Sequence, residues 1–99
     1  MESPLFHKLL EEIRDLHARK NKNYGADNDP FANFREAERL GIEAWRGCLI
    51  RMGDKYCRLM NLARGVPDMV GESMRDTLVD LAVYSLICVC LLDEKNKKE

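Results

Sequence analysis

Apolar residues recur at intervals of three or four along most of this 99-residue chain, which is the spacing of amphipathic α-helices. The first such pattern follows Ser3-Pro4, a pair typical of a helix start, and predicts a helix over residues 4–20. Residues 21–28 are rich in Asn, Asp and Gly and lose the period, which predicts a loop.

Three further helices are predicted after this loop. Asp29-Pro30 repeats the signal of a helix start, so we expect a short helix over residues 31–40 that ends at Gly41. A long pattern over residues 43–64 predicts a third helix, which glycine and proline terminate. Asp68 can cap a last helix that runs to about residue 93 and is apolar almost all round in its second half.

The predicted fold is all-α, a four-helix chain with three long helices and one short one. We expect a single domain over residues 1–93 with a charged tail at 94–99. So short a chain can bury only a modest core, and its long apolar helices therefore predict that a homo-oligomer, a dimer or higher, completes a bundle.

Composition narrows the class of protein. The net charge is -1, from 16 basic and 17 acidic residues, so no basic excess suggests binding to a nucleic acid polymer. The apolar run near the C-terminus is too short to span a membrane, and we expect no membrane partner. The four cysteines form no C-x-x-C pair, and we interpret them as reduced thiols of a cytoplasmic protein.

Three acidic residues of the last predicted helix, Glu72, Asp76 and Asp80, stand four positions apart and form one ridge. Asp80 precedes a long apolar run, so its carboxylate is expected to be partly buried and to need a cation or a metal as partner. Carboxylates in such a set can hold Mg²⁺, usually together with substrate phosphates.

The preceding helix carries a matching row of charged residues at three- and four-residue spacing: Arg51, Asp54, Lys55 and Arg58. If the two helices pack antiparallel, this row faces the acidic ridge, and its cations could clamp phosphates. The alternative is a set of interhelical salt bridges that only fixes the register of the helices.

A second polar cluster lies in and around the predicted loop. Tyr24 could stack on a base while lysine and arginine side chains meet phosphate. The alternative is a solvated loop whose aromatic side chains insert into the core. The residues that we expect to bind a nucleotide here are Lys20, Lys22, Tyr24, Asn33 and Arg35.

Three segments, KNKNYGADNDPFANFR, RMGDKYCRLMNL and ESMRDTLVDLAVYSLI, resemble a phage-enriched family of small proteins, the nucleotide modification associated domain. This family in turn resembles the all-α, MazG-like nucleoside triphosphate pyrophosphohydrolases, which bind Mg²⁺ and the triphosphate with two acidic helix motifs. Asp76 and Asp80 match the second motif in position. The first motif is altered, because Asp54 and Arg58 stand where glutamates are expected.

The resemblance implies a nucleotide-binding protein of phage nucleotide metabolism in the host cytoplasm. In a Mg²⁺-dependent hydrolysis, Asp54, Asp76 and Asp80, with Glu72, would hold the metal, and basic residues would stabilise the phosphates. A guanidinium in place of a carboxylate removes a metal ligand, which favours binding over cleavage. Two alternatives stay open: a non-catalytic protein that sequesters a nucleotide, such as a signal of host defence, and a structural helical interaction protein.

Overall fold

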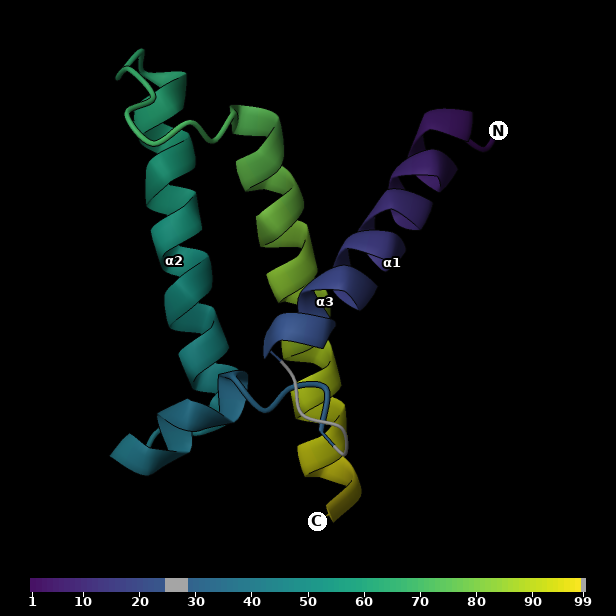
Figure 1. Cartoon of the computed structure of the whole chain (residues 1–99), viewed down its shortest axis with the longest axis vertical. Coiled ribbons are helices and arrows are strands. Elements are labelled where there is room, and N and C mark those ends of the chain that lie inside the picture. Colours follow the sequence, from purple (N-terminus) through teal and green to yellow (C-terminus); the bar gives the residue numbers. More distant parts are fainter. Residues whose placement is uncertain (25–28, 99) are drawn as a thin grey trace. The chain divides into compact units, whose positions relative to one another are not determined.

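The computed structural model describes residues 1–24 and 29–98 (Figure 1). It confirms the all-α prediction, with three long helices and one short one. In the part of the chain described, no helix is both long and apolar enough to cross a membrane. The chain divides into two compact units, residues 1–33 and 34–99, which we treat separately. The helices are α1 (Pro4–Tyr24), the 3₁₀-helix η1 (Phe34–Leu40), α2 (Ala44–Ala63) and α3 (Met74–Lys98).

The first unit consists mainly of α1, which begins at the residue predicted. The hydroxyl of Ser3 accepts a hydrogen bond from the backbone N–H of Phe6 (3.3 Å), as expected of a residue that caps a helix. The helix continues to Tyr24, so the prediction of a loop from residue 21 was wrong. No proline or glycine interrupts residues 20–24, and Lys22 in the last turn interacts favourably with the helix dipole. Positions 25–28 of the predicted loop lie outside the described residues.

The short predicted helix over residues 31–40 is shorter than expected and has 3₁₀ geometry. Asp29 instead holds a turn, because its carboxylate accepts a hydrogen bond from the N–H of Phe31 (3.0 Å). The 3₁₀-helix η1 then covers Phe34–Leu40. It ends at Gly41, whose φ of 75° lies in the left-handed region that favours glycine.

The second unit is built on α2 and α3, which run side by side in opposite directions (Figure 1). The helix η1 packs against α2, where Gly47 allows a close approach. A Cβ atom at position 47 would lie 2.8 Å from the Cβ atom of Ala37. Buried apolar side chains of this unit come from all three helices: Phe34, Ala44, Cys48, Val83, Ile87, Cys88 and Leu91.

The last helix begins later than predicted, because Asp68 does not cap it. The carboxylate of Asp68 accepts a hydrogen bond from the N–H of Val70 (3.0 Å) and so forms a local turn. Gly71 follows with a φ of 74°, which a helix does not tolerate. The cap is Ser73, whose hydroxyl accepts a hydrogen bond from the N–H of Asp76 (3.0 Å).

The last helix also ends later than predicted, at Lys98 instead of residue 93. Two ion pairs hold its C-terminal turns against the rest of the second unit. Arg35 of η1 lies 2.6 Å from Glu94, and Glu43, just before α2, lies 2.9 Å from Lys95. These tertiary contacts stabilise a segment that its composition alone suggests is frayed.

Candidate functional site

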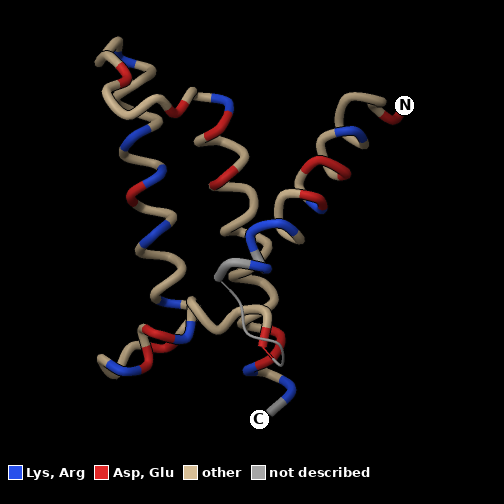
Figure 2. The backbone as a smooth tube through the Cα atoms, viewed as in Figure 1, with Lys and Arg blue, Asp and Glu red and all other residues tan. Residues whose placement is uncertain are grey.

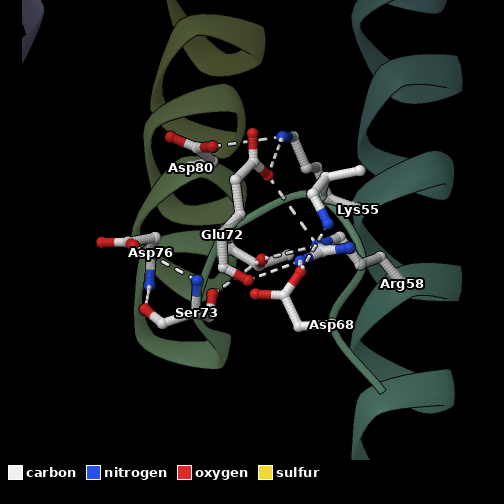
Figure 3. Close-up of polar contacts among 9 residues, drawn as sticks. Lys55, Arg58, Asp68, Glu72, Ser73, Asp76 and Asp80 are labelled. Carbon is white, nitrogen blue, oxygen red and sulfur yellow. Dashed lines mark hydrogen bonds and ion pairs between the residues drawn. The ribbon is translucent and has the colours of Figure 1, made fainter. Parts of the chain in front are cut away.

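Charged side chains of α2 meet carboxylates from α3 and from the segment before it. Figure 2 shows that most charged residues on α2 are basic, whereas the start of α3 is mostly acidic. Lys55 lies between two carboxylates, with its Nζ atom 3.1 Å from Asp80 and 3.6 Å from Glu72 (Figure 3). The predicted row and ridge therefore do face each other at these positions.

Arg58 is held by a larger set of partners. Its Nη2 atom lies 2.7 Å from a carboxylate oxygen of Asp68 and also donates to the backbone carbonyl of Glu72. Its Nε atom donates to the hydroxyl of Thr77 at 3.2 Å. Thr77 is fully buried, and its hydroxyl in turn donates to the carbonyl of Ser73 (3.0 Å). The guanidinium is thus fixed in position by groups on three sides.

Two residues of this cluster, Lys55 and Asp68, have pKa values that their partners shift. Burial acts to lower the pKa of Lys55, but the hydrogen bond to Asp80 and the charges of Asp80 and Glu72 outweigh it, so the pKa lies above its ordinary value. The hydrogen bond from Arg58 lowers the pKa of Asp68, and the N–H of Val70 adds to this effect. Two cations face three carboxylates here, which leaves one negative charge in excess.

Asp76 does not join this cluster. Its carboxylate accepts a hydrogen bond from the N–H of Ser73 (3.3 Å) and completes a capping box with that residue. Figure 3 shows the Asp76 carboxylate pointing away from Lys55 and Arg58. The three acidic residues predicted to form one ridge are therefore divided. Glu72 and Asp80 face α2, whereas Asp76 caps the start of α3.

The other two members of the α2 row are not in the cluster either. The guanidinium of Arg51 lies over the ring of Phe34, 4.9 Å from its centre. Asp54 is exposed. Within residues 1–24 and 29–98, neither Arg51 nor Asp54 forms an ion pair. The metal role of Asp54 therefore stays a prediction.

The residues predicted to bind a nucleotide near the loop are divided between the two units. Lys20 and Lys22 are exposed in the last turns of α1, and Asn33 is half-buried in the turn that follows. The side chain of Tyr24 lies outside what the structure describes. Arg35 belongs to the second unit, where it pairs with Glu94. Whether these residues converge on one ligand stays a prediction.

Whether the carboxylates bind Mg²⁺ stays a prediction. Mg²⁺ needs several oxygen ligands at about 2.0–2.1 Å in octahedral geometry. In this structure the carboxylates of Glu72 and Asp80 both lie close to the ammonium of Lys55. Among the residues described, no group of three or more His, Cys, Asp or Glu side chains could hold a metal ion.

Sequence reasoning missed a pocket of about 430 Å³ at the other end of the second unit. Its wall includes Trp45. The indole N–H of Trp45 donates to Glu43 (3.0 Å), and the hydrogen bond from Lys95 is the main cause that lowers the pKa of Glu43. The pocket is formed by η1, the start of α2 and the end of α3, with Arg35, Glu43, Trp45, Leu91, Glu94 and Lys95 among its lining residues.

Comparison of the chain with models of known protein families, with curated proteins and with solved structures finds no match. The resemblance to the nucleotide modification associated domain therefore stays a prediction that depends on the three sequence segments.

Proposed function

We propose that this protein binds a nucleotide through phosphate contacts to α2 and does not cleave it. The observation that carries the proposal is the position of Lys55, whose ammonium is shared by Glu72 and Asp80. A cation of the protein itself replaces the metal ion that hydrolysis of the predicted kind requires. The nucleotide as ligand is suggested by the resemblance, and so are the phage setting and the host cytoplasm.

Phosphate could bind here by exchanging with the carboxylates. Contact with solvent weakens an ion pair, because water screens the charges and the paired side chains lose freedom. The side chains of Lys55 and Arg58 are 20% and 22% exposed, so both can be reached from solvent. A phosphate that accepts hydrogen bonds from both cations at once replaces two such weak pairs.

Arg58 is suited to this exchange because some of its hydrogen bonds are to groups other than carboxylates. The Thr77 hydroxyl and the Glu72 carbonyl would hold the guanidinium in place after a ligand has displaced Asp68. A donor that is fixed before binding loses little freedom on binding. Arg51, about one turn before Lys55 and without an ion pair among the described residues, would supply a third cation.

A nucleotide panel tests the proposal. Melting temperature and product formation would be followed for the wild type, with and without Mg²⁺, beside Lys55→Gln and the matched control Lys97→Gln at an exposed site on α3. A ligand at a hundredfold excess over Kd stabilises the folded state by about 2.7 kcal/mol. We expect a shift for the wild type and control, a smaller one for Lys55→Gln, and intact ligand throughout. An equal shift in Lys55→Gln refutes the site, and Mg²⁺-dependent products refute binding without cleavage.

A second candidate function is that of a structural helical interaction protein. Two observations favour it. Lys55 and Arg58 are already paired with carboxylates of the protein, and α2 and α3 expose large apolar side chains. In that case the charged cluster only fixes the register of the two helices. No stabilisation by any nucleotide, together with stable assembly, would favour this candidate.

A further inference from the structure

Two of the four cysteines, Cys48 of α2 and Cys88 of α3, are buried in the core of the second unit. Their exposed fractions are only 1% and 7%, whereas Cys57 and Cys90 are exposed. The proposed nucleotide binding uses none of these thiols. Because the buried pair comes from two different helices, its arrangement decides whether those helices can be cross-linked.

Each buried thiol donates a hydrogen bond to the backbone of the opposite helix. The Sγ atom of Cys48 lies 3.3 Å from the carbonyl oxygen of Tyr84, one turn before Cys88 on α3. The Sγ atom of Cys88 lies 3.7 Å from the carbonyl oxygen of Trp45, about one turn before Cys48 on α2. A cysteine side chain ends at its γ atom, so helices whose thiols reach each other's backbone are closely packed at this level.

The register of the two helices places the cysteines opposite each other on separate grounds. Lys55 of α2 donates to Asp80 of α3 (3.1 Å), so these two residues lie at the same level. In an antiparallel pair, two turns back along α2 correspond to two turns forward along α3, or seven residues on each. This step leads from Lys55 to Cys48 and from Asp80 to position 87, the neighbour of Cys88.

The Cys88 thiol also acts on the ionisation of Cys48. Burial raises the pKa of Cys48 to about 11, and the charge of Cys88 and a hydrogen bond to it add to this rise. A hydrogen bond between two thiols requires that their sulfur atoms be neighbours. Because only a thiolate reacts readily, the same shift makes the reduced pair slow to react at neutral pH.

We propose that Cys48 and Cys88 form a disulfide when a peroxide reaches them, and that this cross-link locks α2 against α3. One sulfur, as thiolate, attacks a peroxide oxygen. An S–O bond forms, the O–O bond breaks, and a sulfenic acid and one water result. The second thiolate attacks this sulfur, so that the S–S bond forms, the S–O bond breaks and another water leaves. Two thiols have then lost two electrons and two protons, and hydrogen peroxide has become two waters.

The fold tolerates this cross-link because the core loses little by it. The carbonyls of Tyr84 and Trp45, which lose the thiol donors, lie inside helices and accept from the N–H four residues further on. A disulfide between residues 48 and 88 closes a long loop, which restricts the unfolded chain and stabilises the folded one. This inference does not depend on the proposed nucleotide binding.

The first test uses the full chain with Cys57→Ser and Cys90→Ser, so that only the buried pair can react. Hydrogen peroxide is added at about pH 9, where more of each thiol is ionised, and trypsin digestion without reduction follows. Trypsin cleaves after lysine and arginine, so Cys48 lies in fragment 47–51 and Cys88 in fragment 76–95. Neither fragment contains a methionine that peroxide could oxidise. By mass spectrometry we expect these two fragments joined, within a chain of monomeric mass.

The matched control adds Cys88→Ala to the same background and should give no joined fragments, with sulfinic acid at Cys48 instead. In the chain that keeps both buried cysteines, separate sulfinic acids or unreacted thiols overturn the proposal. A cross-link that forms only in urea overturns it as well, because the fold then does not bring the sulfur atoms together.

A second measurement compares the oxidised and reduced forms of one and the same chain, so it does not depend on how a substitution affects folding. At one fixed protein concentration, the disulfide should raise Tm by at least about 8 °C, and dithiothreitol should reverse the rise. An oxidised form that melts at or below the temperature of the reduced form refutes the lock, because the cross-link then strains the helix pair.

Discussion

Thr77→Val is the most direct perturbation of the arrangement that holds α2 against α3. Valine has nearly the shape of threonine, so the substitution changes hydrogen bonding more than packing. The Thr77 side chain is fully buried, and its hydroxyl accepts from Arg58 Nε (3.2 Å) and donates to the Ser73 carbonyl (3.0 Å).

The expected loss of stability can be worked from these two bonds. The Ser73 carbonyl keeps its bond from the backbone N–H of Thr77 (3.0 Å), so the loss of its second donor matters little. The Arg58 Nε–H loses its close acceptor, since the Glu72 carboxylate is 3.8 Å away. Hydrogen bonds to charged groups contribute about 1.5–3 kcal/mol. We therefore expect Thr77→Val to lower the free energy of unfolding by about 2 kcal/mol, which corresponds to a fall of about 8–16 °C in Tm for a domain of this size.

Urea unfolding followed by circular dichroism at one fixed protein concentration measures this change. The control is Thr77→Ser, which keeps the hydroxyl and loses one methyl group, a change of about 1 kcal/mol. The expected order of stability is wild type, serine variant, valine variant. A valine variant as stable as the serine variant would refute the role assigned to the bond between Arg58 and Thr77.

Three further outcomes are expected. Gly47→Ala should destabilise the protein by about 1–3 kcal/mol in the same assay, although alanine favours helices, because its Cβ would lie 2.8 Å from that of Ala37; a more stable variant contradicts this. The pKa of Asp68 is lowered by its hydrogen bond from Arg58. Its contribution is therefore present above its ordinary pKa of 3.8 and is lost as the pH falls through the lower folded-state value, so the stability difference between wild type and Asp68→Asn should shrink on acidification. Burial raises the pKa of Cys48 to about 11, so mass spectrometry should find it alkylated by iodoacetamide at pH 8 far more slowly than the two exposed cysteines.

Most of the secondary structure could be predicted from sequence, and the errors share a cause. Helices were placed correctly where apolar spacing agreed with a start or stop signal, as with Ser3-Pro4 before α1 and the glycine and proline after α2. The start of α3 was misplaced because two acceptable caps, Asp68 and Ser73, compete within one short segment. In the structure Asp68 forms a local turn and also pairs with Arg58 of α2, a contact between segments that no local pattern contains.

Only part of the candidate site could be predicted from sequence, because the rest depends on contacts between separate segments. Spacing placed Lys55 and Arg58 on one face of α2 and Asp80 on one face of α3, and the structure brings these faces together. Spacing could not show that Asp76 turns back to cap its own helix. It also could not find the pocket beside Trp45, because three separate elements form it.

The sequence by itself determined that this protein is helical, which residues share a helix face, and that the charged rows of α2 and α3 are complementary. These properties are local, since the period of a helix and the identity of neighbouring residues fix them. Only the tertiary structure decided which carboxylate pairs with which cation and that Lys55 lies between Glu72 and Asp80. Those outcomes depend on the register and rotation of one helix against the other, which the packing of the whole unit sets.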